Sequence, residues 1–173
     1  MRLPVLLFGL VLAIGALIAA AMWTGEAAPQ AFPHPDHPSL LRAADGATRV
    51  APVWWIGAAL GALEIAFFAG CFALGLRRQG SLGPLARPLW LGLALYEAVY
   101  VLLLIAYRAF LAAPTSELVL SFPAPTTVML FGLWPVPLWF LWIYLRHFDD
   151  WVLRDEDLVR IRRLAAGDDP EPR

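Results

Sequence analysis

Apolar residues dominate four long stretches of the chain, and polar or charged residues gather between and after them. Each stretch matches the roughly 20 helical residues that cross a hydrocarbon core about 30 Å thick. Continuous apolar runs satisfy their backbone hydrogen bonds in lipid as helices, whereas a membrane barrel needs short alternating strands. The pattern therefore predicts four transmembrane helices, at about residues 3–23, 52–76, 88–107 and 126–147.

Composition supports an all-α integral membrane protein built as a four-helix transmembrane bundle. The chain has 173 residues, of which 60% are hydrophobic and 16% charged, whereas soluble domains are about half apolar and a quarter charged. The net charge of −1 argues against a nucleic-acid partner, because no basic surface is large enough to release many counterions. The single Cys71 excludes a disulfide or a thiolate metal cage within one chain.

The arginine distribution predicts the orientation, because basic residues favour the cytoplasmic side. With the N-terminus inside, the cytoplasmic segments carry Arg2, Arg77, Arg78, Arg87, Arg146, Arg154, Arg160, Arg162, Arg163 and Arg173. The outer side, with loops 24–51 and 110–125, carries only Arg42, Arg49 and Arg108. We expect a multi-pass protein of the bacterial inner membrane with both termini cytoplasmic. The first span is expected to be a retained anchor, since it is longer than a signal peptide's apolar core, although cleavage is the alternative.

Residues 1–147 form the predicted membrane domain, and residues 148–173 a cytoplasmic helix and tail. The stretch "RDEDLVRIRRLAA" places acids first and arginines last, as the helix dipole favours. Leu158, Ile161 and Ala165 would share one face of this amphipathic helix. This helix is expected to contact either an anionic lipid surface or a partner protein. We favour the partner protein because the nearby acidic residues would be repelled by anionic lipid headgroups. The residues expected at this contact are Leu158, Arg160, Ile161, Arg162 and Arg163.

Two carboxylates, Glu64 and Glu97, interrupt the second and third spans. Each acid lies near the middle of its span, and the two spans run in opposite directions. At about 1.5 Å of rise per residue, both acids therefore lie at a similar depth in the membrane. An intramembrane charge is costly, and we expect one or both to be protonated and hydrogen-bonded to each other, to Tyr96 or to Tyr100, or to hold a cation. A polar contact between helices is the favoured interpretation. A proton or sodium site is the alternative.

Two further patterns concern packing. Gly57, Gly61, Glu64, Phe68 and Cys71 recur at helical spacing and predict a close helix contact, mainly through Gly57, Gly61 and Cys71. Pro135 and Pro137 in "FGLWPVPLWFLW" predict a kink or break in the fourth span. Broken helices line ion sites in transporters, but a static kink is the favoured interpretation.

Enzymatic chemistry finds no support in the sequence, and no cofactor is predicted. His34, Asp36 and His37 lie close together in "FPHPDHP" and are a weak candidate for a metal site. The intervening prolines hold such a segment extended, so the three side chains are not expected to converge on one ion. We predict no metal.

The segment "LFGLWPVPLWFLWIYLRHFDDWVLRDEDLVRIRRL" resembles the ends of small integral membrane proteins encoded beside sodium/solute symporters. In those proteins a Pro-broken last span precedes a short charged cytoplasmic helix. The resemblance covers only the C-terminal quarter, and many of those proteins have two spans where four are predicted here. It implies a non-catalytic accessory subunit of a larger membrane complex, with a transport complex as the expected kind. The expected partners are lipid and another integral membrane protein, and a second copy of this chain is a further candidate. The alternative is a small oligomeric proton- or sodium-coupled transporter or channel that uses the two carboxylates.

Overall fold

The structure, a computed structural model, describes residues 3–24, 32–37, 39–42, 50–78, 80–113, 118–152 and 155–166. Four of its helical segments are long and apolar enough to cross a membrane, namely Leu3–Thr24, Ala51–Leu76, Gly83–Ala112 and Ala124–Arg146. The predicted helical fold class, with four helices long and apolar enough to cross a membrane, is therefore confirmed. The predicted tail after residue 166 and most of the loop 24–51 lie outside the described residues.

The first three spans are largely continuous helices. They are α1 (Leu3–Thr24), α3 (Trp54–Leu76) and α4 (Ala86–Ala112), and short 3-10 turns at Ala51–Val53 (η2) and Gly83–Leu85 (η3) precede α3 and α4. The third helix continues to Ala112, past the predicted end at Tyr107, and the Ala113 N–H closes its last turn on the Ala109 carbonyl at 3.0 Å. The C-terminal part of this helix thus includes Arg108.

The fourth span consists of three pieces. A short α5 (Ala124–Thr127) leads into a π-helical segment η4 (Val128–Leu133), and α6 (Val136–Arg146) follows after a turn. The backbone N–H of Trp134 bonds the Met129 carbonyl, the i→i+5 pattern of a π-helix, at 3.1 Å. The interruption coincides with Pro135, which has no N–H to continue an α-helical ladder.

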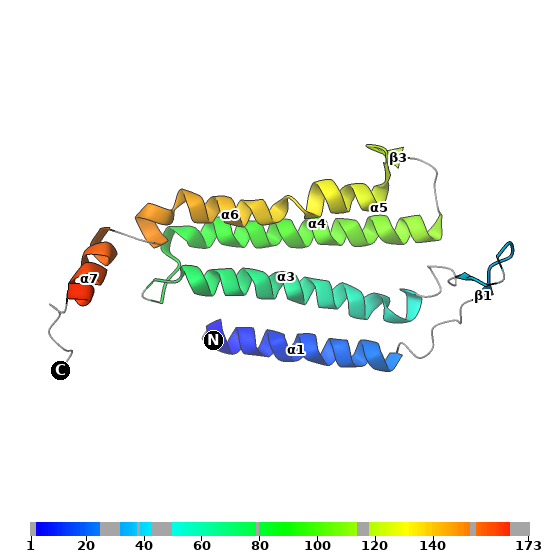
Figure 1. Ribbon diagram of the computed structural model, residues 1–173, viewed down its shortest axis with the longest axis horizontal. Helices are drawn as coiled ribbons and strands as arrows, with labels where there is room; N and C mark the ends of the chain where they lie inside the picture. Colours follow the sequence, from blue (N-terminus) through cyan, green and yellow to red (C-terminus); the bar gives the residue numbers. More distant parts are fainter. Residues whose placement is uncertain are drawn as a thin grey trace.

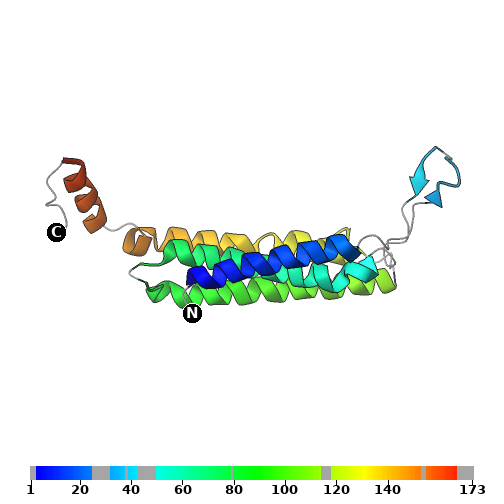
Figure 2. The same ribbon diagram turned by 90° about the horizontal axis from the view of Figure 1, so that it is seen from below.

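The helices run side by side as an elongated bundle (Figures 1 and 2). The first helix, α1, packs against α3, and α4 packs against both α3 and the fourth helical segment. The beginning of α1 lies at the same end of the bundle as the C-terminal helix α7 (Asp155–Ala166), and the hairpins lie at the other end (Figure 1). Both described ends of the chain therefore share one end of the bundle.

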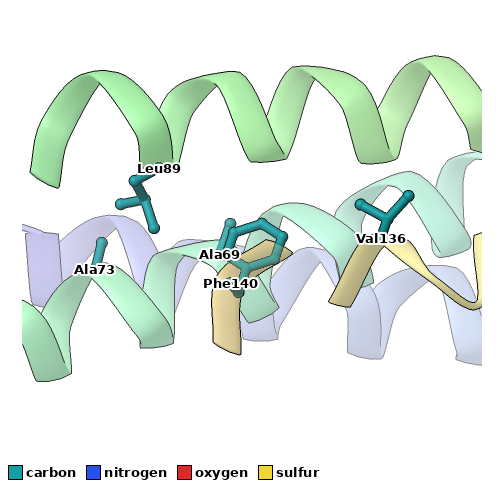
Figure 3. Close-up of a cluster of buried hydrophobic side chains, with 5 residues drawn as sticks. All are labelled: Ala69, Ala73, Leu89, Val136 and Phe140. Carbon is teal, nitrogen blue, oxygen red and sulfur yellow. The ribbon is translucent and has the colours of Figure 1, made fainter. Parts of the chain in front are cut away.

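The core is small and lies where α3, α4 and α6 meet. One cluster of buried side chains comes from all three helices and is shown in Figure 3: Ala69, Ala73, Leu89, Val136 and Phe140. The Phe140 ring meets the rings of Phe68 and Phe72 edge-on, with centroids 5.3 and 5.6 Å apart. Edge-to-face geometry is the arrangement that the ring quadrupoles favour. Aromatic contacts thus tie α6 to α3.

Two hairpins lie at the end of the bundle opposite α7. The strands β1 (Phe32–Pro33) and β2 (Leu41–Arg42) pair antiparallel, as do β3 (Leu118–Val119) and β4 (Phe122–Pro123). The second hairpin turns through Leu120 and Ser121, which both have positive φ. The buried Thr127 hydroxyl donates a hydrogen bond to the Val119 carbonyl at 2.6 Å, and this contact holds the hairpin against α5.

Candidate functional site

A groove of about 340 Å³ lies at the middle of the bundle, where a carboxylate and two tyrosines line it among apolar residues. Helix α3 contributes Glu64, α4 contributes Tyr96 and Tyr100, and the fourth span contributes Leu133 and Pro137 on either side of its interruption. The structure therefore brings together one carboxylate, both tyrosines and the broken helix. This groove is the candidate site.

The two carboxylates differ in their surroundings. Glu64, near the middle of α3, is exposed on the surface of the bundle and lines the groove, whereas Glu97 is half-buried on α4 and is not among the groove residues. Within the described ranges, no hydrogen bond or ion pair joins either carboxyl group to another side chain. The expected hydrogen bonds between these acids and the tyrosines are thus not formed in the single chain.

Tyr100 makes an interhelical polar contact of another kind. Its hydroxyl lies 3.1 Å from the Gly57 carbonyl and 3.3 Å from the Ala58 carbonyl of α3, and donates to them rather than to a carboxylate. The ring lies directly over Gly61, where any Cβ would collide with it. Tyr96, the other groove tyrosine, meets the Phe68 ring edge-on with centroids 6.5 Å apart. Tyr100 and Gly61 thus fix how closely α3 approaches α4.

The predicted packing stripe on α3 is only partly correct. The residues of this helix that are buried are Ile65, Ala69, Gly70, Ala73 and Leu76. At about 100° per residue, this set is centred roughly 140° around the helix from the stripe through Gly57, Glu64 and Cys71. Cys71 is exposed, and a Cβ on Gly57 would meet open space although the Gly57 carbonyl accepts a hydrogen bond from Tyr100, whereas Gly61 lies directly against the Tyr100 ring. The face around Glu64 and Cys71 is therefore turned outward.

The helix break at Pro135 and Pro137 borders the groove. Pro135 lies in the turn before α6, and Pro137 follows in the first turn of that helix and lines the groove beside Leu133. Because proline rings remove two N–H groups here, the backbone of the fourth span departs from an α-helix at the depth of the groove. The break and the carboxylate of Glu64 thus belong to one site.

The histidine segment forms a small hairpin without a metal-binding geometry. The His34 and His37 rings stack with centroids 5.3 Å apart, and the Asp36 backbone N–H donates to His34 Nδ1 at 3.2 Å. That hydrogen bond occupies one of the nitrogen lone pairs that a metal would need. Across the described residues, no three His, Cys, Asp or Glu side chains gather in a way that could hold a metal ion.

The end of the bundle nearest α7 carries two contacts that sequence reasoning missed. The Trp151 indole N–H donates to the Leu76 carbonyl at 2.9 Å, and its ring lies over Gly83. Arg78 binds Asp157 of α7 in a two-pronged ion pair, with N···O distances of 2.7 and 2.8 Å. The sequence signal for the contact of Trp151 was a single tryptophan in a charged segment. No local pattern signals an ion pair between residues so far apart in the sequence.

Helix α7 is otherwise exposed. Its apolar residues Leu158, Ile161 and Leu164 have 37%, 55% and 55% of their surface accessible, and Arg160, Arg162 and Arg163 are exposed as well. No described part of the chain covers the expected contact surface of this helix. The Arg78–Asp157 pair links the helix to the α3–α4 loop. The groove at Glu64 and the face of α7 are therefore both left uncovered by the described part of the chain.

Comparison of the chain with protein-family models, with curated proteins and with solved structures gave no match.

Proposed function

We propose that the protein is a non-catalytic accessory subunit of a larger complex in the bacterial inner membrane, in keeping with the family that its C-terminal segment resembles. In this proposal the four helices cross the membrane, both ends of the chain are cytoplasmic, and the groove at Glu64 receives a transmembrane helix of the partner. Helix α7 adds a second contact on the cytoplasmic side.

The observation that carries the proposal is the exposure of Glu64 near the middle of a helix long and apolar enough to span a membrane. A charged side chain at the centre of a bilayer costs about 2.5–3.5 kcal/mol on insertion scales, so such residues face protein or water rather than lipid. Within the described chain, nothing hydrogen-bonds to this carboxyl group. A polar group on a partner helix would supply the missing contact.

The test is recovery of the partner with variants of Glu64. Wild-type protein with an affinity tag, extracted gently from its native membrane, should carry a larger membrane protein that mass spectrometry identifies. Glu64→Leu removes the polar contact, which is worth about 1 kcal/mol and hence roughly fivefold in binding, so recovery of the partner should fall by about that factor. Glu97→Leu is the matched control, because Glu97 sits at similar depth but outside the groove. Equal recovery with both variants would contradict the proposal.

The proposed orientation makes a separate prediction. Alkaline phosphatase is active only outside the cytoplasm, so a fusion after Gly46, in the first outer loop, should be active, and a fusion after Gly80, between the second and third spans, should be inactive. The asymmetry of arginine favours this result, because the segment around Gly80 contains Arg77, Arg78 and Arg87 and no acid. Activity of the Gly80 fusion alone would indicate the opposite orientation.

Proton- or sodium-coupled transport is the second candidate function. It is favoured by one observation, that Pro137 of the interrupted fourth span and Glu64 line the same groove. Interrupted helices expose backbone carbonyls, which coordinate cations in transporters. Purified protein in liposomes separates the two functions: a transporter moves cations without a partner and loses that flux in Glu64→Gln, whereas an accessory subunit carries no flux alone.

A further inference from the structure

A second cavity, of about 290 Å³, lies at the end of the bundle opposite α7. The first turn of α3 and the last turns of α4 line it, with Trp54, Trp55, Arg108 and Leu111 among the lining residues. Arg108 follows Tyr100 by two helical turns, so this cavity is separate from the groove at Glu64. Its size is close to the lower limit of about 300 Å³ for small-molecule sites.

The cavity combines one positive charge with aromatic and aliphatic walls. The Arg108 guanidinium carbon lies 5.9 Å from the centre of the Trp54 ring, and that ring in turn stacks on Tyr107 with centroids 6.2 Å apart. A cation held over an aromatic face keeps its N–H groups available at the edge of its plane. Within the described ranges, Arg108 forms no ion pair, and no other lining residue is charged. The site therefore complements one negative charge.

The position of the cavity selects the kind of anion. It lies at the end of two helices that are long and apolar enough to span a membrane, which is the depth of lipid headgroups. Trp55 is 74% exposed beside it, and tryptophan at this depth has an apolar ring that suits the boundary between headgroups and acyl chains. A ligand with an anionic head and an apolar tail matches this arrangement of groups, whereas a free anion would leave the apolar walls unused.

We propose that this cavity binds an anionic phospholipid, with Arg108 on the phosphate and Trp55 and Leu111 against the upper part of an acyl chain. The planar guanidinium fork matches the phosphate oxygens, which form charge-assisted hydrogen bonds with arginine. The proposal requires that the chain spans a membrane but is independent of the accessory role. It assigns a structural lipid to the joint between the ends of α3 and α4.

Native mass spectrometry of the full-length protein with added phosphatidylglycerol tests the proposal. The wild-type protein should retain one lipid about tenfold more tightly than Arg108→Gln, which keeps a polar side chain able to donate hydrogen bonds but removes its charge. Arg108→Lys should recover part of the affinity. Arg87→Gln, which removes an exposed arginine at the other end of the same helix, is the matched control and should bind like wild type.

Several results would overturn the proposal. Equal retention of lipid by wild type and Arg108→Gln would do so, as would a loss in Arg108→Lys as large as in Arg108→Gln. Phosphatidylethanolamine, whose ammonium compensates the phosphate, should bind severalfold more weakly, and equal binding would contradict the anionic preference. Millimolar inorganic phosphate should leave the lipid bound, and displacement would mean that the cavity recognises the anion alone.

Discussion

Replacing Phe140 with alanine should destabilise the bundle by about 2–3 kcal/mol, the largest loss that we expect from a single side chain. Phe140 is 1% exposed and meets both Phe68 and Phe72 edge-on. In soluble proteins such a truncation costs about 3–5 kcal/mol, of which part is transfer from water. Lipid is as apolar as the core, so only the packing and cavity terms apply in a membrane. Equilibrium unfolding in mixed micelles measures the loss.

The neighbouring helix position gives the control for this substitution. Leu138→Ala truncates a side chain of α6 that is 62% exposed and contacts lipid in the proposed setting, so its removal should change stability by less than about 0.5 kcal/mol. If both substitutions cost the same, the contact of α6 with α3 does not hold the bundle together.

Gly61→Ala should have the next largest effect, a destabilisation of about 1–3 kcal/mol. The new methyl group would overlap the Tyr100 ring, so α3 and α4 must separate, and the hydrogen bonds from Tyr100 to Gly57 and Ala58 would lengthen or break. The movement also alters the wall of the groove beside Glu64. Unfolding equilibria of the purified variants provide the measurement.

Two further variants isolate the cause. Gly57→Ala adds the same methyl group one turn earlier on α3, where nothing lies within 4 Å, and should be neutral or stabilising by a few tenths of a kcal/mol because alanine is the better helix former. In the presence of Tyr100→Ala, Gly61→Ala should cost little, since the clash is gone. A double-mutant cycle with no coupling between the two positions would exclude the proposed contact.

The number and approximate bounds of the spans could be predicted because length and apolar character suffice for that purpose. Which face of each span is buried could not. In lipid, both the buried and the outward-facing positions are apolar, so the pattern along α3 does not distinguish Ala69 and Ala73, which are buried, from Cys71, which is exposed. The stripe of small residues therefore could not be assigned to a contact within the chain or between chains, and the buried face of α3 lies roughly 140° around the helix from it, at about 100° per residue.

The candidate site was predictable in its components but not in its contacts. Carboxylates and prolines stand out in an apolar run, so Glu64, Pro135 and Pro137 were identified from the sequence alone. That Tyr100 bonds to backbone carbonyls instead of a carboxylate depends on how α3 and α4 are rotated about their axes. The cavity at Arg108 also escaped notice, because its two walls come from the beginning of α3 and the end of α4, which extends beyond its predicted bound.

The link between α7 and the bundle has a consequence for how the helix responds to its surroundings. Trp151 is held by a ring contact and a hydrogen bond to Leu76, neither of which depends on ionic strength. The Arg78–Asp157 pair beyond it has side chains that are 26% and 34% exposed, and such pairs contribute about 0–1 kcal/mol and weaken as salt is added. Added salt should therefore weaken the contact between Arg78 and α7 and leave the attachment at Trp151 unchanged.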